Sequence, residues 1–183
     1  MDRHVFLIGL RGSGKSTVGS LLSDLLNRPC FDTDLFVIEQ ANCSIAEIFS
    51  SEGESGFRDR ESEALLSLSQ RPPAVIATGG GVILRETNRE VMTRAGFIVL
   101  LTAPISVLAD RITRDPSSKA ARPTLVQDAL SVQQEIQELS DARSDLYHSL
   151  ADFVCSTEDR SPNEVASSIV EKLQAGSLGS KRP

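Results

Sequence analysis

The chain has 183 residues, of which 40% are hydrophobic and 24% are charged, a composition that excludes a long disordered polymer and a fibrous repeat. Its formal net charge of −6 argues against a broad surface that binds the phosphate backbone of DNA or RNA. No stretch approaches the roughly 18 consecutive apolar residues of a membrane span, so we expect a cytoplasmic protein that contacts neither nucleic acid nor membrane.

The first part of the chain is predicted to alternate strand and helix. Residues 5–8 form a short apolar run that Gly9 ends, which is typical of a buried central strand. Apolar residues then recur every three or four positions, which indicates an amphipathic helix running to about Asn27. A brief strand around residues 30–31 follows and leads into two aspartates.

Two helices and a third strand are predicted next. Ser44 and Glu47 have the spacing of a capping box, which predicts a short helix through Phe49. Gly53 is expected to break the chain before a second helix. Residues 74–78 form an apolar strand that runs into three consecutive glycines.

The next helix is predicted to be capped by Thr87 and Glu90, and the fourth strand to cover residues 97–102. Pro104 suits the first turn of the helix that follows. Residues 114–125 are rich in Ser, Ala, Pro and basic side chains without periodicity, which indicates an exposed, mobile lid.

The last part of the chain is predicted to contain a long helix over residues 126–150, a strand over 153–155 and a helix starting at 161–164. The strand is expected at an edge of the sheet or as its fifth member. Strand and helix alternate throughout, which favours a three-layer α/β/α sandwich around a central five-stranded parallel sheet. We expect one domain over residues 1–175 and a disordered tail over 176–183.

The strongest local signal is Gly-Leu-Arg-Gly-Ser-Gly-Lys-Ser at residues 9–16, which fits a phosphate-binding loop between a strand and a helix. Glycines let successive backbone N–H groups converge on phosphate oxygens, and the helix start adds positive partial charge. Lys15 is expected to reach the β and γ phosphates of ATP, and the Ser16 hydroxyl to ligate Mg²⁺. The predicted ATP-binding residues of this loop are Gly12, Ser13, Gly14, Lys15, Ser16 and Thr17.

Two carboxylates, Asp32 and Asp34, follow the second predicted strand. In an extended segment residues two apart point to the same side, so both are expected to face the cleft where open α/β sheets bind ligands. One acid beside Mg²⁺ and one beside the acceptor hydroxyl would serve phosphoryl transfer. A solvated Asp-x-Asp turn or a helix cap is the alternative interpretation.

Three further features are candidates for ligand binding. Arg58 and Glu61 lie three residues apart on a predicted helix, so Glu61 can orient the guanidinium, although a surface ion pair is the alternative. The glycines at residues 79–81 permit close approach of the backbone to a ligand or a turn with φ > 0, and a flexible loop is the alternative. Arg122 has the character of a lid residue that closes over a triphosphate, unless it is only solvated.

The three cysteines are odd in number, far apart and form no Cys-x-x-Cys pair. Neither a disulfide framework nor a zinc site is therefore favoured. Buried reduced thiols are expected at Cys30, Cys43 and Cys155.

The ordered set of motifs resembles the shikimate kinase family from about residue 5 to residue 173. The combination is more specific than any single motif. The motifs are Gly12-Ser-Gly-Lys-Ser-Thr-Val-Gly19, Asp32-Thr-Asp34, Ser44-Ile-Ala-Glu-Ile-Phe49, Gly53-Glu54 with Phe57-Arg58 and Glu61, Ala77-Thr-Gly-Gly-Gly81, Arg122-Pro123, and Arg143 with Leu146-Tyr147. The resemblance implies a P-loop fold like that of nucleoside monophosphate kinases, and transfer of the ATP γ-phosphoryl group to the 3-hydroxyl of shikimate.

The resemblance also implies a role for individual residues. Asp34 would contact the ring hydroxyls and is the candidate base, while Asp32 would help to hold Mg²⁺ through water. Arg58 and Arg143 would clamp the substrate carboxylate, and Arg122 would stabilise charge on the transferring phosphates. The other implied substrate-binding residues are Phe49, Phe57, Gly79, Gly80 and Gly81.

On the nucleotide side the resemblance implies ATP contacts from Arg114 and Arg122, and it matches Arg160 and Pro162 to the family segment beside adenine. The chain departs from the family's commoner pattern at Arg11 and in the sequence Arg-Pro-Thr-Leu after residue 121. The implied partner is the small-molecule substrate alone, and a monomer is expected.

Two other functions compete with this interpretation. Another P-loop small-molecule kinase, acting on gluconate or a nucleotide, is the nearest alternative. A non-catalytic nucleotide switch is the other, but the chain has no Asn-Lys-x-Asp guanine-reading motif. The intact set of Lys15, Ser16, Asp32 and Asp34 also argues against a catalytically silent site.

Overall fold

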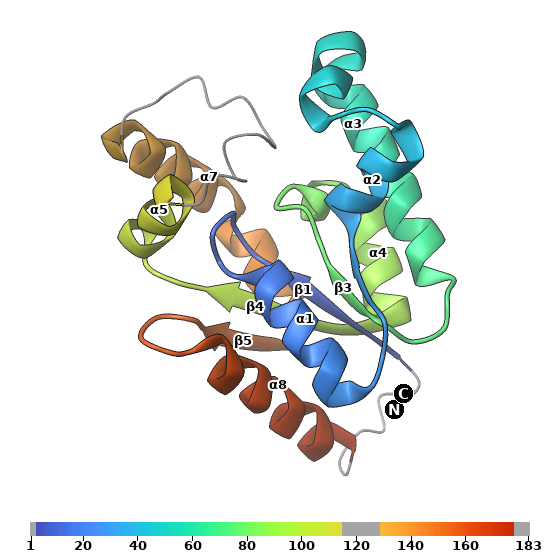
Figure 1. The fold of residues 1–183 in the computed structure, drawn as a ribbon, viewed down its shortest axis with the longest axis vertical. Coiled ribbons are helices and arrows are strands. Elements are labelled where there is room, and N and C mark those ends of the chain that lie inside the picture. Colours follow the sequence, from blue (N-terminus) through green and yellow to red (C-terminus); the bar gives the residue numbers. More distant parts are fainter. Residues whose placement is uncertain (1–2, 115–128, 178–183) are drawn as a thin grey trace.

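The computed structural model describes residues 3–114 and 129–177. Within these ranges helices cover both faces of one five-stranded sheet (Figure 1). The strands are β1 (His4–Ile8), β2 (Cys30–Asp32), β3 (Val75–Ala77), β4 (Gly96–Thr102) and β5 (Phe153–Ser156). The helices are α1 (Lys15–Leu26), α2 (Thr33–Ala41), α3 (Ile45–Ser69), α4 (Glu86–Ala95), α5 (Ile105–Arg114), α7 (Ala129–Leu150) and α8 (Pro162–Ser177), with a 3₁₀ turn, η1, at Val82–Leu84.

The strand order is β2-β3-β1-β4-β5, and every neighbouring pair is parallel. The predicted five-stranded parallel sheet is therefore confirmed, with β1 at its centre and β5 at one edge. Val5 pairs with Val75 of β3 on one side and with Phe97 of β4 on the other, and these pairs fix the register of the three central strands.

Side chains of β1 alternate between two cores because successive residues of a strand point to opposite faces. Val5 and Leu7 pack in a cluster that includes residues of α1 and α8. Phe6 and Ile8 pack in a second cluster with residues of α3, α4 and α7. These clusters hold three layers together, as the sequence predicted.

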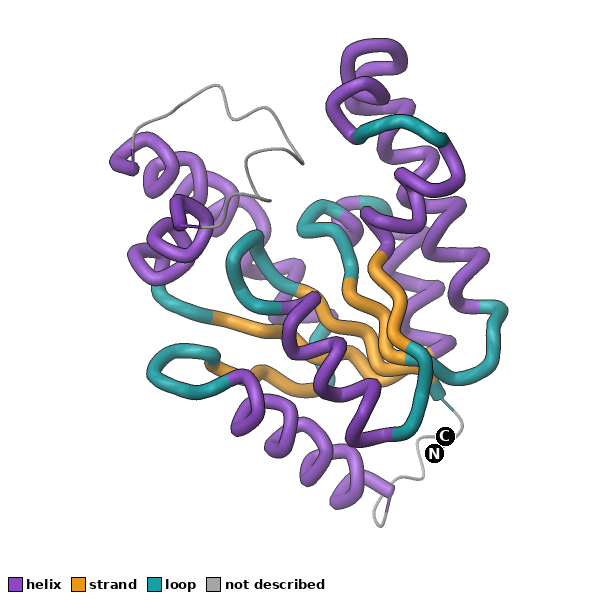
Figure 2. The backbone as a smooth tube through the Cα atoms, viewed as in Figure 1, coloured by secondary structure: helices purple, strands orange, loops and turns teal. Residues whose placement is uncertain are grey.

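All five strands end at the same edge of the sheet, where ligands of open α/β folds bind. Figure 2 shows the loops that leave β1 and β3 rising between the α5–α7 helices on one side and the α2–α3 helices on the other. The phosphate-binding loop, the two aspartates and the glycine run therefore share one edge.

Helix α2 was not predicted, and it changes the local geometry of the two aspartates. Asp32 is the N-cap of α2, and its Oδ1 accepts hydrogen bonds from the backbone N–H groups of Asp34 and Leu35. Asp34 lies in the first helical turn. The extended segment assumed from the sequence is thus wrong, because the carboxylate of Asp32 satisfies the N–H groups that open a helix.

The predicted break at Gly53 is confirmed within the span Ile45–Ser69. Gly53 has non-helical backbone angles, φ 70° and ψ −174°, so α3 consists of two helical parts that meet at a kink there. The predicted capping box is confirmed, since Glu47 N–H donates to Ser44 Oγ and the Ser44 N–H donates to Glu47 Oε2. The same reciprocal pattern joins Ser161 and Glu164 at the start of α8.

The predicted cap of α4 is wrong. The helix begins at Glu86 after Arg85 in extended conformation, with no capping side chain, so Thr87 already lies within the first turn. Asn88 anchors this turn instead, because its buried side-chain amide donates to the Val82 carbonyl.

The cysteine prediction is only partly right. All three thiols are free, but Cys155 alone is buried, whereas Cys30 and Cys43 are half-buried. None of the described helices has the length and apolarity needed to cross a membrane. Most of the predicted lid, the first residues of the predicted helix at 126–150 and most of the predicted tail lie outside the described residues.

Candidate active site

The loop after β1 takes a backbone path that only glycine adopts without strain. Gly9, Gly12 and Gly14 have φ values of 140°, 80° and 91°. A Cβ on Gly12 would lie 2.9 Å from the carbonyl oxygen of Leu108, so the loop also packs tightly against α5. Gly14 is the N-cap of α1 and supplies no capping side chain, which leaves the start of the helix suited to an anion.

Lys15 is folded over this loop. Its Nζ donates to the carbonyl oxygens of Gly9 and Leu10, each at 2.9 Å. The ammonium group is thereby positioned above the same turn whose amides are predicted to receive phosphate. Phosphate oxygens can replace both carbonyls as hydrogen-bond acceptors of Lys15 Nζ, because charged oxygens are stronger acceptors.

The two predicted metal ligands are in direct contact. Ser16 Oγ donates to Asp32 Oδ2 at 2.8 Å, while the other oxygen of Asp32 caps α2. A hydroxyl and a carboxylate are the hard oxygen ligands that Mg²⁺ prefers. Among the described residues there is no cluster of three His, Cys, Asp or Glu side chains.

Gly79 brings two acidic side chains together beside this loop. A Cβ on Gly79 would lie 2.5 Å from Asp34 Oδ1 and 2.6 Å from Glu61 Oε1. The Gly79 N–H donates to Thr33 Oγ1 at 2.9 Å, which ties the glycine run to the first turn of α2. Gly79 does not have a positive φ, so its backbone conformation does not require glycine. The close approach of the two carboxylates does, because a Cβ would collide with both of them.

Arg58 is buried, so its pairing with Glu61 is not an ordinary surface ion pair. Arg58 is 8% exposed and Glu61 is 1% exposed, and their Nη1 and Oε2 atoms lie 2.8 Å apart. Burial opposes the charged guanidinium, yet the carboxylates of Glu61 and Glu54 outweigh it and raise the pKa of Arg58. The guanidinium also lies against Gly81, where any Cβ would collide with it.

Two phenylalanines form an aromatic wall next to Arg58. The ring centroids of Phe49 and Phe57 are 4.9 Å apart, and the Arg58 guanidinium lies 5.3 Å from the Phe57 centroid. This arrangement combines apolar surface with a fixed positive charge, which suits a small hydrophobic ring that carries a carboxylate.

The carbonyl of Gly80 collects two donors from α7. Arg143 Nη1 donates to it at 3.2 Å and the Tyr147 hydroxyl at 2.5 Å. Arg143 is thus brought to the glycine run, and its contact with substrate stays a prediction. Tyr147 was given no role from the sequence, although its place one helical turn after Arg143 could have suggested a shared face.

Sequence reasoning missed Arg111, which links the phosphate-binding loop to the end of β5. Its Nη1 donates to the Gly12 carbonyl at 3.3 Å and to Thr157 Oγ1 at 2.8 Å, and its Nη2 donates to the Thr157 carbonyl at 2.8 Å. Arg114, the predicted ATP contact, pairs with Asp110 at 2.9 Å and its side chain is 79% exposed, and its contact with ATP stays a prediction. Arg111 lies one helical turn before Arg114 on the same predicted helix, and this spacing was the signal in the sequence that could have identified it.

The remaining predicted nucleotide residues lie at the start of α8. Arg160 donates to the Glu164 carbonyl at 2.8 Å and to Ser168 Oγ at 2.5 Å, and Pro162 is the first residue of the helix. Arg160 therefore fixes the entry to α8, and its contact with adenine stays a prediction. Arg122 lies outside the described residues.

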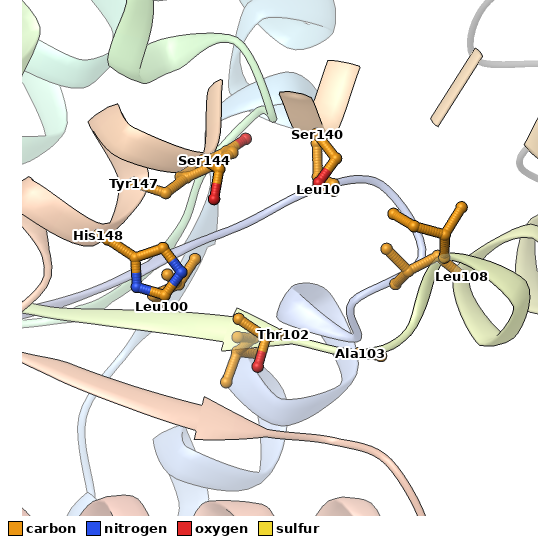
Figure 3. Close-up of a pocket in the computed structure, with 11 residues that line it drawn as sticks. Leu10, Leu100, Thr102, Ala103, Leu108, Ser140, Ser144, Tyr147 and His148 are labelled. Carbon is orange, nitrogen blue, oxygen red and sulfur yellow. The ribbon is translucent and has the colours of Figure 1, made fainter. Parts of the chain in front are cut away.

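A cavity of about 90 Å³ lies behind the phosphate-binding loop, between β4, α5 and α7 (Figure 3). Ser140, Ser144 and His148 on α7 line one side and Leu10 and apolar residues of β4 and α5 the other. Neither the Arg58 cluster nor the aspartates line this cavity, so the charged groups described above define the candidate site.

Residues 11–174 match the sequence family described as shikimate kinase. A shikimate kinase of Rhodopirellula baltica is 41% identical over 177 residues, covering 97% of this chain and 93% of the relative. Shikimate kinase 2 of Escherichia coli O1:K1 is 44% identical over 173 residues, covering 94% and 97%. The solved structure of a shikimate kinase from Acinetobacter baumannii in complex with shikimate superposes with a TM-score of 0.88, at 32% identity, covering 97% of this chain and 96% of that one.

Proposed function

Since the chain belongs to the shikimate kinase family and is an ATP-dependent phosphotransferase of aromatic amino-acid biosynthesis, we propose how its own residues carry out the transfer. The γ-phosphoryl group of ATP passes to the 3-hydroxyl of shikimate, giving shikimate 3-phosphate and ADP. One observation supports the proposal above all. A buried arginine, a carboxylate and a glycine run gather beside a phosphate-binding loop at one edge of the sheet.

The nucleotide is held by the backbone amides of residues 12–17. Lys15 exchanges the carbonyls of Gly9 and Leu10 for the β and γ phosphates, a short movement because its Nζ already lies over the loop. Arg122 stabilises charge on the transferring phosphates. The other proposed ATP contacts are Arg114, Arg160 and Pro162.

Mg²⁺ is proposed to bind at Ser16, with Asp32 holding it through water. The contact of Ser16 Oγ with Asp32 Oδ2 supports this assignment, because it fixes both oxygens before nucleotide binds. When bound, the ion neutralises charge on the β and γ phosphates. Asp32 also caps α2, so its orientation is set independently of the ion.

Asp34 is the proposed base. Its backbone N–H is bonded to Asp32 and its carboxylate packs against Gly79, so the carboxylate is held between the metal ligands and the glycine run. There it orients the acceptor hydroxyl and accepts its proton as the phosphoryl group is transferred.

The acid substrate is proposed to bind beside the glycine run, with its acceptor hydroxyl at Asp34. Arg58 and Arg143 pair with its carboxylate, because arginine offers two parallel N–H donors that match a carboxylate. Phe49 and Phe57 cover its apolar face, and residues 79–81 approach its ring. The A. baumannii relative solved with shikimate supports this choice of substrate.

A coupled assay of ADP release tests the proposal on the purified protein. We expect turnover with shikimate, and much less or none with gluconate or nucleoside monophosphates; quinate tests how narrow the acid specificity is. Turnover with a nucleotide or gluconate alone would reject the assigned substrate. We further propose a cytoplasmic monomer, which light scattering of the purified protein tests for the oligomeric state.

A further inference from the structure

Arg58 has two carboxylate partners that differ sharply in burial. Glu61 binds Nη1 at 2.8 Å and its side chain is 1% exposed. Glu54 binds Nη2 at 3.2 Å and its side chain is 66% exposed. The contact with Glu61 is buried, whereas the contact with Glu54 is longer and open to water. Replacing Glu54 by another carboxylate therefore costs little free energy, and replacing Glu61 costs much more.

One N–H donor of Arg58 has no hydrogen-bond acceptor among the described residues. This donor is the buried Nε. In a planar guanidinium Nε and Nη2 lie on the same edge, and such an edge binds a carboxylate with two parallel hydrogen bonds. A buried donor without an acceptor is unfavourable, so this edge is suited to a ligand that satisfies both nitrogens.

The backbone beside Glu54 has room to move. Gly53 precedes it, with φ 70° at the kink of α3, and a Cβ placed on Gly53 would meet no heavy atom within 4 Å. Glu54 therefore sits at an open turn on the protein surface rather than in a packed helix. Its carboxylate can leave Arg58 without disturbing the buried pair with Glu61.

We propose that Glu54 binds Nη2 on the Nε–Nη2 edge of Arg58 as a partial stand-in for the carboxylate of the acid substrate, and so sets the affinity of the site for that carboxylate. The inference rests on the proposed role of Arg58 in substrate binding. A ligand with a carboxylate displaces Glu54 and gains two hydrogen bonds. A neutral ligand cannot replace the lost ion pair, so Glu54 also selects against neutral polyols.

Competition by an exposed ion pair at i,i+4 spacing lowers affinity modestly, by about twofold to fivefold. Glu54→Gln removes the charge and keeps the shape of the side chain. Glu52→Gln is a matched control, because Glu52 lies in the same helix and pairs with Arg60 at 2.8 Å on the surface. Its partner is not part of the proposed site.

Calorimetry with shikimate and with shikimate methyl ester, which lacks the carboxylate charge, tests the proposal on both variants. We expect Glu54→Gln to bind shikimate about twofold to fivefold more tightly than the unmodified protein, with no such gain for the ester. Glu52→Gln should bind both ligands as the unmodified protein does.

The outcomes separate this inference from the proposed function. If the unmodified protein binds and phosphorylates shikimate but Glu54→Gln binds it no more tightly, Glu54 only supports Arg58 and the inference fails alone. An equal gain for the ester also overturns it, since the effect would not depend on the carboxylate. If the unmodified protein does not bind shikimate, the proposed function and the inference fail together. If it phosphorylates shikimate but Arg58→Ala binds shikimate normally, the proposed role of Arg58 and the inference fail while the proposed activity stands.

Discussion

Individual side chains of the site are held in place by bonds that ATP and substrate would partly replace. Lys15 is bonded to two carbonyls of its own loop, and Ser16 to Asp32. Arg58 is bonded to two carboxylates. Such preorganisation lowers the cost of positioning charged groups during the reaction, because little reorganisation is left to do.

Lys15→Ala is expected to lower kcat by at least about 10²-fold, because it removes the cation that is predicted to stabilise charge on the γ-phosphoryl group during transfer. The lost bonds to Gly9 and Leu10 also free the loop, so ATP binding should weaken. Steady-state kinetics and ATP calorimetry measure the two effects. Lys172→Ala, whose side chain contacts the Phe153 ring, is the control and should retain normal kinetics. A near-normal kcat in Lys15→Ala would reject its role.

Asp34→Asn is expected to lower kcat by at least about 10²-fold, since the amide cannot accept the proton of the acceptor hydroxyl. The change is nearly isosteric, so the contact with Gly79 should persist and the KM for shikimate should change much less than kcat. Steady-state kinetics with shikimate measure this split. If kcat stays within a few-fold of normal, Asp34 is not the base, whatever happens to binding.

Helix α3 links stability to the proposed substrate recognition, because one element carries the capping box, the kink at Gly53 and the Arg58–Glu61 pair. The capping box fixes where the helix starts, and the kink turns the segment that bears Glu54 and Arg58 relative to that start. Helix α2 packs beside α3 and begins at the cap formed by Asp32. The cap of α2 and the kink of α3 therefore lie on neighbouring helices beside the proposed metal-binding residue Asp32 and the proposed acid-binding residue Arg58.

Ser44→Ala is expected to lower the free energy of unfolding by about 1 kcal/mol, because it removes the hydroxyl that accepts from the Glu47 N–H. Urea denaturation followed by circular dichroism measures this loss. Ser51→Ala, in the same helix, serves as the control. Its hydroxyl bonds only to carbonyls of the preceding turn, so the loss should be smaller. Equal losses in the two variants would contradict a special role for the cap.

At the scale of the whole molecule, the parallel sheet assembles the site from distant parts of the chain. The central position of β1 places its loop between the segments after β2 and β3 on one side and the end of β4 on the other. Arg143 and Tyr147 of α7 then donate hydrogen bonds to the carbonyl of Gly80 in the glycine run. The site therefore depends on the cooperative fold and not on any single segment.

The stability of the whole molecule should depend on pH in a predictable way. Hydrogen bonds from Ser44 and Ser161 lower the pKa of Glu47 and Glu164 below the ordinary value of 4.5. Groups with a lowered pKa stabilise the fold above that value, and the contribution is lost as the pH falls through the folded pKa. Burial raises the pKa of Cys30 and Cys155 above the ordinary 9.0, so their contribution is complete below 9.0 and is lost above it.

We therefore expect the free energy of unfolding to be greatest between pH 4.5 and pH 9.0 and to fall on both sides. Urea denaturation at a series of pH values, under reducing conditions, measures the profile. Replacing both cysteines with alanine should flatten the alkaline side and leave the acid side unchanged. Stability that rises steadily above pH 9.0 in the unmodified protein would contradict this assignment.

The sequence by itself determined the strands, most helices and the phosphate-binding loop, because these depend on residues that are close in the chain. Apolar runs of the right length predict buried strands, and the glycines of residues 9–14 predict a loop whose backbone N–H groups converge on phosphate. The capping box at Ser44 was also predictable, since both partners lie within one helical turn. Candidate site residues near these elements could be named for the same reason, and their roles stay predictions.

Only the tertiary structure decided how those elements meet. Arg143 and Gly80 are 63 residues apart and Tyr147 and Gly80 are 67 apart, so no local pattern reports their contact. The burial of Arg58, the link from Arg111 to Thr157 and the leftover Nε donor likewise arise from packing between elements. Local sequence specifies the geometry of a short backbone segment, but burial and long-range partners are properties of the whole folded chain.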